Sequence, residues 1–273
     1  MDKDHLTPKI MGILNVTPDS FSDGGRFLSV DAAVEHGISM VDAGADIIDV
    51  GGESTRPGSV FVPESEELDR VIPVIEGIRQ RSSITVSIDT SKPAVAKAAV
   101  LAGATIINDV SMLRTGTELA QIAATHDATL ILMHSRGTPE DMQRHTDYRD
   151  VVAEVRNELL GAVNRAVRCG VDAERIWLDP GIGFAKTAEQ SLVLIASLRV
   201  FSNTGYPVLV GPSRKSFISA FDQSDVDNRL GGTAAAVAVS VFNGASVVRV
   251  HDIRIMKQAA MIGAKLREAA ENR

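Results

Sequence analysis

Short runs of apolar residues alternate along this chain with longer segments in which apolar residues recur every three or four positions. The short runs are rich in Ile, Val and Leu and are too short for helices. Such runs are typical of strands in a parallel sheet, which is covered on both faces. We predict eight strands, at Ile10–Leu14, Asp46–Val50, Ile84–Ile88, Thr105–Ile107, Thr129–Met133, Ile176–Leu178, Val208–Val210 and Ser246–Val250.

The segments between these runs have the periodicity of amphipathic helices. Val34, Ile38 and Val41 fall on one helical face, and Gly44 marks a helix end. Eight strand–helix units predict a (β/α)8 TIM barrel, an α/β fold, and an open doubly wound sheet is the alternative. No linker or low-complexity tract divides the chain, so we predict a single domain over residues 1–273. Related helical patterns occur at residues 67–81, 93–104, 150–170 and 231–245.

The composition narrows the class of protein. The chain has 273 residues, with 28 Lys or Arg against 35 Asp or Glu, and its net charge is −7. Nucleic-acid binding and polybasic membrane anchoring both depend on an excess of Lys and Arg, so we expect neither partner. Cys169 is the only cysteine, which excludes intrachain disulfides. Because no apolar stretch reaches the roughly 18 residues of a membrane span, we expect a cytoplasmic protein.

Polar and ionisable residues gather where the predicted strands end. In a barrel, the carboxyl ends of all the strands meet on one face, where active sites lie. Asp89, Asn108 and Asp179 come at the ends of the third, fourth and sixth runs. Each acid alone is explained by helix capping. Independent capping does not explain why every run ends in polar residues, so we predict a functional site on this face.

The strand ends carry two kinds of chemistry. Four cations lie near the ends of these strands. Arg56 follows the second strand and Lys215 follows the seventh, while Arg249 lies in the eighth strand and His251 directly follows it. Cations after strands seven and eight, with a helix beginning near Ser216, favour an anionic ligand group such as a phosphate. The carboxylates and the amide on the other strands suit the N–C–NH2 edge of a pteridine, purine or pyrimidine. The pattern therefore predicts a polar heterocycle that carries an anionic group.

A metal held by several protein ligands is not favoured. None of the six histidines has a compact zinc-binding spacing. Mg²⁺, by contrast, takes few protein ligands and is held largely by water and substrate phosphates. Asn15, at the end of the first strand, supplies one suitable oxygen, so the sequence is compatible with a Mg²⁺ cofactor.

Seven segments, in order along the chain, carry a resemblance to a known family. They are residues 15–25 (NVTPDSFSDGG), 49–58 (DVGGESTRPG), 87–90 (SIDT), 107–110 (INDV), 179–184 (DPGIGF), 213–217 (SRKSF) and 249–252 (RVHD). Together they resemble the dihydropteroate synthases, folate-pathway enzymes that join a dihydropterin diphosphate to p-aminobenzoate. That family has a (β/α)8 barrel, in agreement with the count of strand–helix units.

The resemblance implies a role for each matching residue. It places the pterin on Asp89, Asn108, Met133, Asp179, Phe184, Lys215 and Arg249. It places the diphosphate on Asn15, Thr55, Arg56, Arg249 and His251, with Mg²⁺ bound by Asn15. Phe21 and Ser216 are implied to contact p-aminobenzoate. Asp23, Arg249 and His251 are implied to be catalytic, because they stabilise the charges that develop as diphosphate leaves.

Two other functions share parts of this pattern. A pterin-dependent methyltransferase domain has the same barrel but does not need the SRKSF and RVHD segments. A non-catalytic pterin-binding scaffold is expected to have lost Asn15, Asp23 or the pair Arg249 and His251, all of which are present.

The resemblance also implies a homodimer and sensitivity to sulfonamides. The Ala-rich segments 231–245 and 255–270 are a candidate interface, although packing within the barrel explains them equally well. No insertion is evident beside residues 213–217, which is the basis for expecting an ordinary sulfonamide target.

Overall fold

The computed structural model describes residues 7–17, 26–54, 59, 61–114, 116–225 and 228–272, with the backbone alone at 26–29 and 222. Eight parallel strands form one sheet in the order β6-β5-β4-β3-β2-β1-β8-β7. The strands are β1 (Lys9–Asn15), β2 (Ile47–Gly51), β3 (Thr85–Asp89), β4 (Ile106–Asp109), β5 (Thr129–Met133), β6 (Ile176–Asp179), β7 (Leu209–Val210) and β8 (Val247–Val250).

The two ends of this sheet meet, so the sheet closes into a barrel. Leu178 of β6 and Val208, just before β7, form a parallel bridge, and the Leu178 amide donates to the Pro207 carbonyl over 2.9 Å. The predicted barrel is therefore confirmed, and the open doubly wound sheet is wrong.

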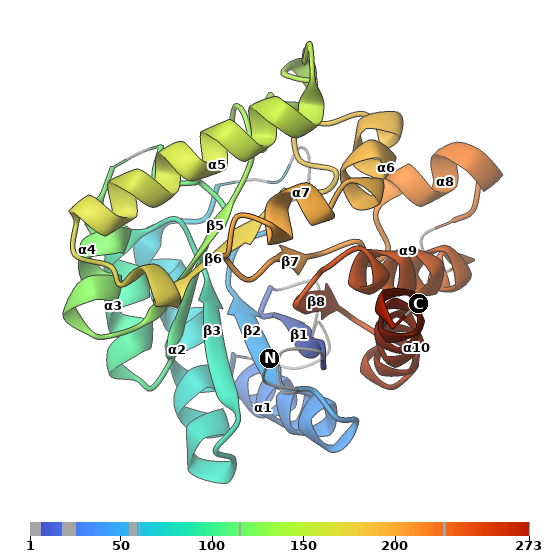
Figure 1. Cartoon of the computed structure of the whole chain (residues 1–273). Coiled ribbons are helices and arrows are strands. Elements are labelled where there is room, and N and C mark those ends of the chain that lie inside the picture. The colour runs from blue at the N-terminus through green and yellow to red at the C-terminus, as the bar shows by residue number, and fades with distance from the viewer. Residues whose placement is uncertain are drawn as a thin grey trace.

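Helices surround the barrel on its outside (Figure 1). Among the described residues, one α-helix follows each of the first five strands, whereas two α-helices follow β6 and two follow β7. None of the helices in the described part of the chain is long and apolar enough to cross a membrane. The helices are α1 (Arg26–Asp42), α2 (Glu64–Arg81), α3 (Pro93–Leu101), α4 (Glu118–Thr125), α5 (Val151–Arg168), α6 (Ala188–Ala196), α7 (Arg199–Ser202), α8 (Ser216–Asp222), α9 (Leu230–Phe242) and α10 (Ile253–Glu271).

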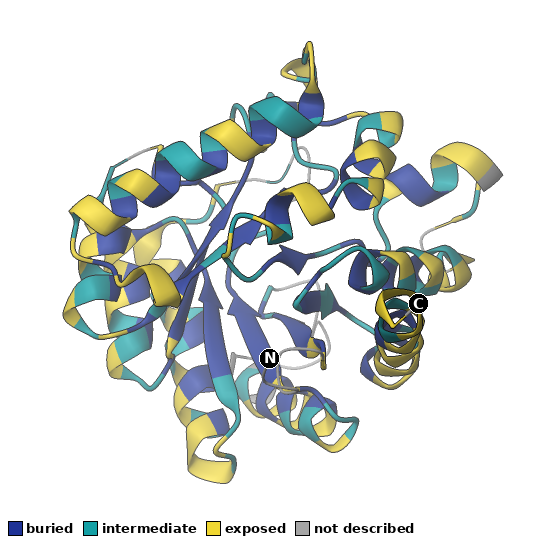
Figure 2. Cartoon of the chain, in the orientation of Figure 1, coloured by how far each residue is buried: buried dark blue, intermediate teal, exposed yellow. Residues whose placement is uncertain are grey.

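Strand alternation divides the core into two parts. Buried side chains such as Ile10, Ile48 and Val50 belong to the large cluster between the strands and the helices. Their neighbours in sequence therefore point into the barrel, where a separate apolar cluster lies. The strands are dark blue in Figure 2, and exposed positions lie on the outer faces of the helices. The inner cluster consists of Met11, Ile47, Ile106, Ile131, Leu209 and Val247, with Trp177 packed against it.

In three of the strands, the inward-facing residue two positions after a member of this inner cluster is polar or charged. Ile47 is followed by Asp49, Ile106 by Asn108, and Val247 by Arg249. The period of two that fills the barrel with apolar side chains therefore also aims these polar groups into its carboxyl-terminal mouth.

Several strands extend one or two residues beyond their predicted carboxyl ends. β3 ends at Asp89, β4 at Asp109 and β6 at Asp179. These site residues are consequently part of the hydrogen-bonded sheet, which holds them more rigidly than a loop does.

Candidate active site

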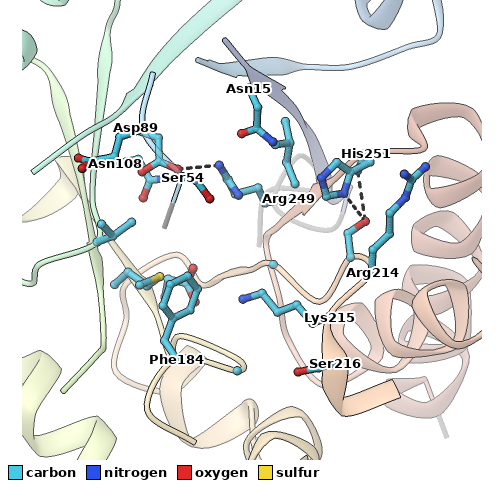
Figure 3. Close-up of a pocket in the computed structure, with 18 of the residues that line it drawn as sticks. Asn15, Ser54, Asp89, Asn108, Phe184, Arg214, Lys215, Ser216, Arg249 and His251 are labelled. Atoms are coloured by element: carbon cyan, nitrogen blue, oxygen red, sulfur yellow. Dashed lines mark hydrogen bonds and ion pairs between the residues drawn. The ribbon is translucent and has the colours of Figure 1, made fainter. Parts of the chain in front are cut away.

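A cavity of about 420 Å³ opens at the carboxyl ends of the strands (Figure 3). All of the predicted site residues that the structure describes line it. Four further predicted residues, Phe21, Asp23, Thr55 and Arg56, lie outside the described residues. The predicted residues that line the cavity are Asn15, Asp89, Asn108, Met133, Asp179, Phe184, Lys215, Ser216, Arg249 and His251.

Arg249 is held by two buried carboxylates from neighbouring strands. Its Nε donates to Oδ2 of Asp49 over 2.6 Å, and its Nη2 donates to Oδ2 of Asp89 over 2.7 Å. Burial, opposed by the charge of Arg249, raises the pKa of Asp89 to about 7. The guanidinium is therefore fixed in orientation at one wall of the cavity, and Figure 3 shows it directed at Asp89.

Three oxygens in this wall are buried and accept no hydrogen bond from the described residues. They are Oδ1 of Asp49, Oδ1 of Asp89 and Oδ1 of Asn108. Because a buried acceptor without a donor is costly, such oxygens indicate a place where a ligand supplies the donors. Asp89 and Asn108 line the cavity and therefore present acceptors to a ligand.

Asp179 adds a further carboxylate on the far side of the mouth. Its Oδ1 accepts the Gly181 amide over 2.7 Å, which anchors the turn that follows β6. Burial raises the pKa of Asp179, and the charge of Lys215 opposes that rise. Asp179 is thus both a turn anchor and an acceptor in the cavity.

Lys215 is the cation that faces this carboxylate. It directly precedes α8, its Nζ donates to the Ile182 carbonyl, and the same atom lies 4.3 Å from the centre of the Phe184 ring. Burial lowers the pKa of Lys215 to about 8, although the charge of Asp179 opposes this. Figure 3 shows Lys215 and Phe184 side by side at the same edge of the cavity.

A second group of cations comes from the loops after β7 and β8. Nδ1 of His251 lies 2.9 Å from Oγ of Ser213, which fixes the plane of the imidazole ring. Arg214 pairs with Asp252 over 2.8 Å, and Arg229 donates to the Arg214 carbonyl over 2.9 Å. Among these, His251, Arg214 and Arg229 all line the cavity, so its wall at this edge is basic.

A buried ion cluster lies beneath the start of the loop after β2. Lys92 Nζ contacts Glu53 Oε2 over 2.6 Å and also contacts Oε2 of the fully buried Glu67. The other Glu53 oxygen accepts the Val62 amide over 2.9 Å. Glu53, which lines the cavity, therefore ties residue 53 to residue 62 across the intervening loop.

Asp109, at the end of β4, has a structural role only. Its two oxygens accept the amides of Ser111 and Leu113, each over 2.7 Å. It is not among the residues that line the cavity. Asp109 therefore anchors a turn and does not cap a helix, because α4 begins only at Glu118, with Thr117 at its N-cap. Asp89 and Asp179, by contrast, face the site.

A metal ion in this cavity would take most of its ligands from water and substrate, because the protein offers few. Within the described ranges, no group of three or more His, Cys, Asp or Glu side chains is arranged to hold an ion. Asn15 offers one neutral carboxamide oxygen at the cavity wall. One protein oxygen, completed by water and phosphate oxygens, fits Mg²⁺ and does not fit zinc.

Sequence reasoning missed three residues that shape this cavity. Asp49 lies within an apolar strand run, and the available signal was its inward-facing position two residues after Ile47. Glu53 and Arg229 gave no comparable signal, because their partners come from other loops and helices.

Comparison with known proteins places the chain in a class of enzymes. The model of the family described as "Pterin binding enzyme" matches residues 11–251. The chain belongs to the pterin-binding enzyme family. Within that family it belongs to the dihydropteroate synthases, as its similarity to several of them shows. A dihydropteroate synthase from Synechocystis is 49% identical over 93% of this chain and 88% of its own length.

Solved structures of the same group have the same fold. A dihydropteroate synthase from Clostridium difficile with pteroic acid gives a TM-score of 0.91 at 42% identity, over 97% of this chain and 99% of that chain. The Xanthomonas albilineans enzyme with 4-aminobenzoic acid gives 0.87 at 42% identity, over 97% and 93%. The Yersinia pestis enzyme with a sulfonamide drug complex gives 0.90 at 39% identity, over 98% and 96%.

Proposed function

We propose that this protein condenses a 7,8-dihydropterin-6-ylmethyl diphosphate with p-aminobenzoate, forming 7,8-dihydropteroate and releasing diphosphate. One observation carries the proposal: a single cavity presents unpartnered acceptors from Asp89 and Asn108 opposite a basic edge formed by Lys215 and His251. The acceptors suit the N–H edge of a pterin, and the basic edge suits an anionic substituent.

The pterin ring is positioned by groups from different strands. Asp89, Asn108 and Asp179 accept its N–H donors, while Lys215 donates to its acceptors. Met133 and Phe184 line the same cavity and supply apolar contact to the ring. Because these side chains are held by the sheet and by each other, the ring loses little binding energy to reorganisation of the site.

Diphosphate leaves when the bond between the pterin methylene carbon and the diphosphate oxygen breaks. The bonding electron pair departs with diphosphate, and the carbon cation that remains is delocalised into the pterin ring. In this proposal Arg249 and His251, together with Thr55 and Arg56, bind the departing anion. Asn15 would hold a Mg²⁺ ion, which when bound supplies additional charge to the diphosphate oxygens.

The amino group of p-aminobenzoate then forms the new C–N bond and releases one proton. A weakly basic arylamine is neutral at pH 7, so the step needs no strong base. Ser216, which lines the cavity at the start of α8, and Phe21 are proposed to contact the arylamine, with Ser216 binding its carboxylate. Asp23 stabilises the positive charge on the pterin until the arylamine attacks.

Purified protein tests the proposal directly. With dihydropterin diphosphate, p-aminobenzoate and Mg²⁺, we expect release of diphosphate together with dihydropteroate, and loss of both when Mg²⁺ is chelated. A folded protein that binds pteroic acid but forms no dihydropteroate would favour the non-catalytic scaffold. Transfer of a methyl group from a methylated pterin to a corrinoid would favour the methyltransferase.

Asp23→Ala tests the proposed catalytic role of that carboxylate. We expect kcat to fall by about 100-fold with little change in pteroic acid affinity, because the carboxylate acts on charge that exists only in the transition state. Rapid-mixing kinetics and calorimetry measure the two quantities. Equal losses in kcat and in affinity would contradict the role.

We also propose that the protein is a cytoplasmic homodimer. Ile255, Ile262 and Leu266 form an exposed apolar stripe on α10 at positions i, i+7 and i+11. Val239 on the adjacent α9 is exposed as well. An apolar helix face that nothing in the described part of the chain covers supports association with a second copy.

A further inference from the structure

Asp49 is a fully buried carboxylate beneath the proposed pterin site. It lies in the middle of β2, between Ile47 and Gly51, and it does not line the cavity. A single oxygen, Oδ2, accepts both Nε of Arg249 over 2.6 Å and Nδ2 of Asn108 over 3.1 Å. This one atom therefore connects two residues of the cavity wall that come from β8 and β4.

The chemistry of a carboxylate decides which way the Asn108 amide faces. A carboxylate paired with a guanidinium only accepts hydrogen bonds, so Asn108 must turn its NH2 group toward Asp49. Its carbonyl oxygen is then directed away from Asp49, and this oxygen is buried without a donor among the described residues. The cavity consequently meets an acceptor at Asn108 rather than a donor.

We propose that Asp49 is a positioning residue that determines the donor and acceptor pattern of the pterin site. By accepting from Asn108 it fixes the amide as an acceptor, and by accepting from Arg249 it fixes the guanidinium beside Asp89. The inference rests on the proposed function, because it assigns a cause to the selectivity of that site for a heterocyclic edge rich in N–H donors.

The proposal predicts a specific defect in Asp49→Leu, which keeps the size of the side chain but removes both carboxylate oxygens. The NH2 group of Asn108 and the Nε of Arg249 then lose their shared acceptor. Asn108 is free to flip and to present its own NH2 group to the cavity. That group opposes the N–H donors of a pterin, and we expect pteroic acid to bind at least about tenfold more weakly.

Asp49→Asn provides the decisive comparison. Because one oxygen serves both donors in the wild-type protein, the amide oxygen of the introduced side chain can take its place and accept from both Arg249 and Asn108. The NH2 group then takes the position of Oδ1, which accepts no hydrogen bond from the described residues. We expect its pteroic acid affinity to lie within about threefold of wild type, whereas a role that depends only on the charge of Asp49 predicts a loss as large as that in Asp49→Leu.

Calorimetry with pteroic acid on wild type and the two variants measures these affinities, and thermal unfolding checks their folding. Asp46→Asn is the matched control: Asp46 directly precedes β2, where it accepts the Ile10 amide over 2.8 Å, and the affinity of this variant should be unchanged. Steady-state kinetics add a second readout, since Asp49→Leu should raise KM for the pterin substrate more than KM for p-aminobenzoate.

The outcomes separate this inference from the proposed function. Wild-type protein that fails to bind pteroic acid would overturn the proposed function itself. If wild type binds, two results would overturn the role of Asp49 alone: a folded Asp49→Leu protein with wild-type affinity, or an Asp49→Asn protein that loses as much affinity as Asp49→Leu. If Asp49→Leu fails to fold, Asp49→Ala, which also lacks the acceptor, takes its place in the comparison.

Discussion

Asp179 and Lys215 show how burial adjusts individual side chains in this site. Both are placed in the cavity wall, and burial raises the pKa of Asp179 while it lowers the pKa of Lys215. Each charge partly opposes the shift of the other. The pair consequently remains available to a polar ligand, because neither group is satisfied by solvent.

Asp179→Asn is expected to weaken pteroic acid binding by about 10- to 100-fold, corresponding to the loss of a hydrogen bond to a charged group. The Asn oxygen keeps the bond from the Gly181 amide, so the turn remains, while one ligand acceptor becomes a donor. Asp109→Asn is the control, because Asp109 caps a turn outside the cavity. It should lower the free energy of unfolding by about 1–2 kcal/mol and leave affinity unchanged. Unchanged affinity in Asp179→Asn would remove this residue from the pterin contacts.

The titration of Lys215 predicts an alkaline limit to activity. Its pKa is lowered to about 8, so the ammonium form dominates below that pH and is lost above it. The value of kcat/KM for the pterin substrate, which reports the free enzyme, should fall by up to about tenfold per pH unit above pH 8. Lys215→Arg stays charged and should lack this fall, even at a lower overall rate. The same fall in both proteins would assign it to another group.

At the scale of elements, the turn after β6 is held against the end of β5. Lys186, almost fully buried, has its Nζ 3.0 Å from Nδ1 of His134 and donates to the Phe184 carbonyl over 2.8 Å. Gly181 has a φ of +67°, and a Cβ added there would lie 1.9 Å from the His134 carbonyl oxygen. The two strand ends therefore approach so closely that only glycine fits, and this approach places Phe184 at the cavity.

Gly181→Ala is expected to lower the free energy of unfolding by about 2–4 kcal/mol, because backbone strain and a clash with main-chain atoms add together. Gly205→Ala separates the two effects. Gly205 has a φ of +90°, but nothing lies within 4 Å of an added Cβ, so only the strain of about 1 kcal/mol applies. Chemical denaturation of both variants measures the difference. Equal destabilisation would show that the contact with His134 is unimportant.

At the scale of the whole molecule, the cavity of the barrel is rich in charged side chains, whereas part of its outer helical surface is apolar. The net charge of −7 does not describe the cavity, where Lys215, Arg249 and His251 lie together. On the outside, α9 packs against α10, so part of each Ala-rich segment is used within the chain. The apolar stripe on α10 remains exposed, and the proposed dimer would bury it.

Light scattering after gel filtration tests the dimer. We expect a mass near twice the 29.1 kDa of one chain, and Ile262→Glu, at a side chain 56% exposed, should shift it to one chain. A charge in the middle of an apolar contact costs far more than it does in water. Leu101→Glu, 69% exposed at the end of α3, should leave the mass unchanged. A wild-type mass of one chain would contradict the proposal.

The sequence by itself determined the barrel and half of the residues that line the cavity. Apolar runs and helical periodicity are local properties, so the strands were found within a residue or two, and strand ends converge in any barrel. Only the tertiary structure separated Asp89 and Asp179, which line the cavity, from Asp109, which caps a turn. It also decided the contact of Asp49 with Arg249, 200 positions later in the chain. Such partners depend on the register of distant strands, which no local pattern encodes.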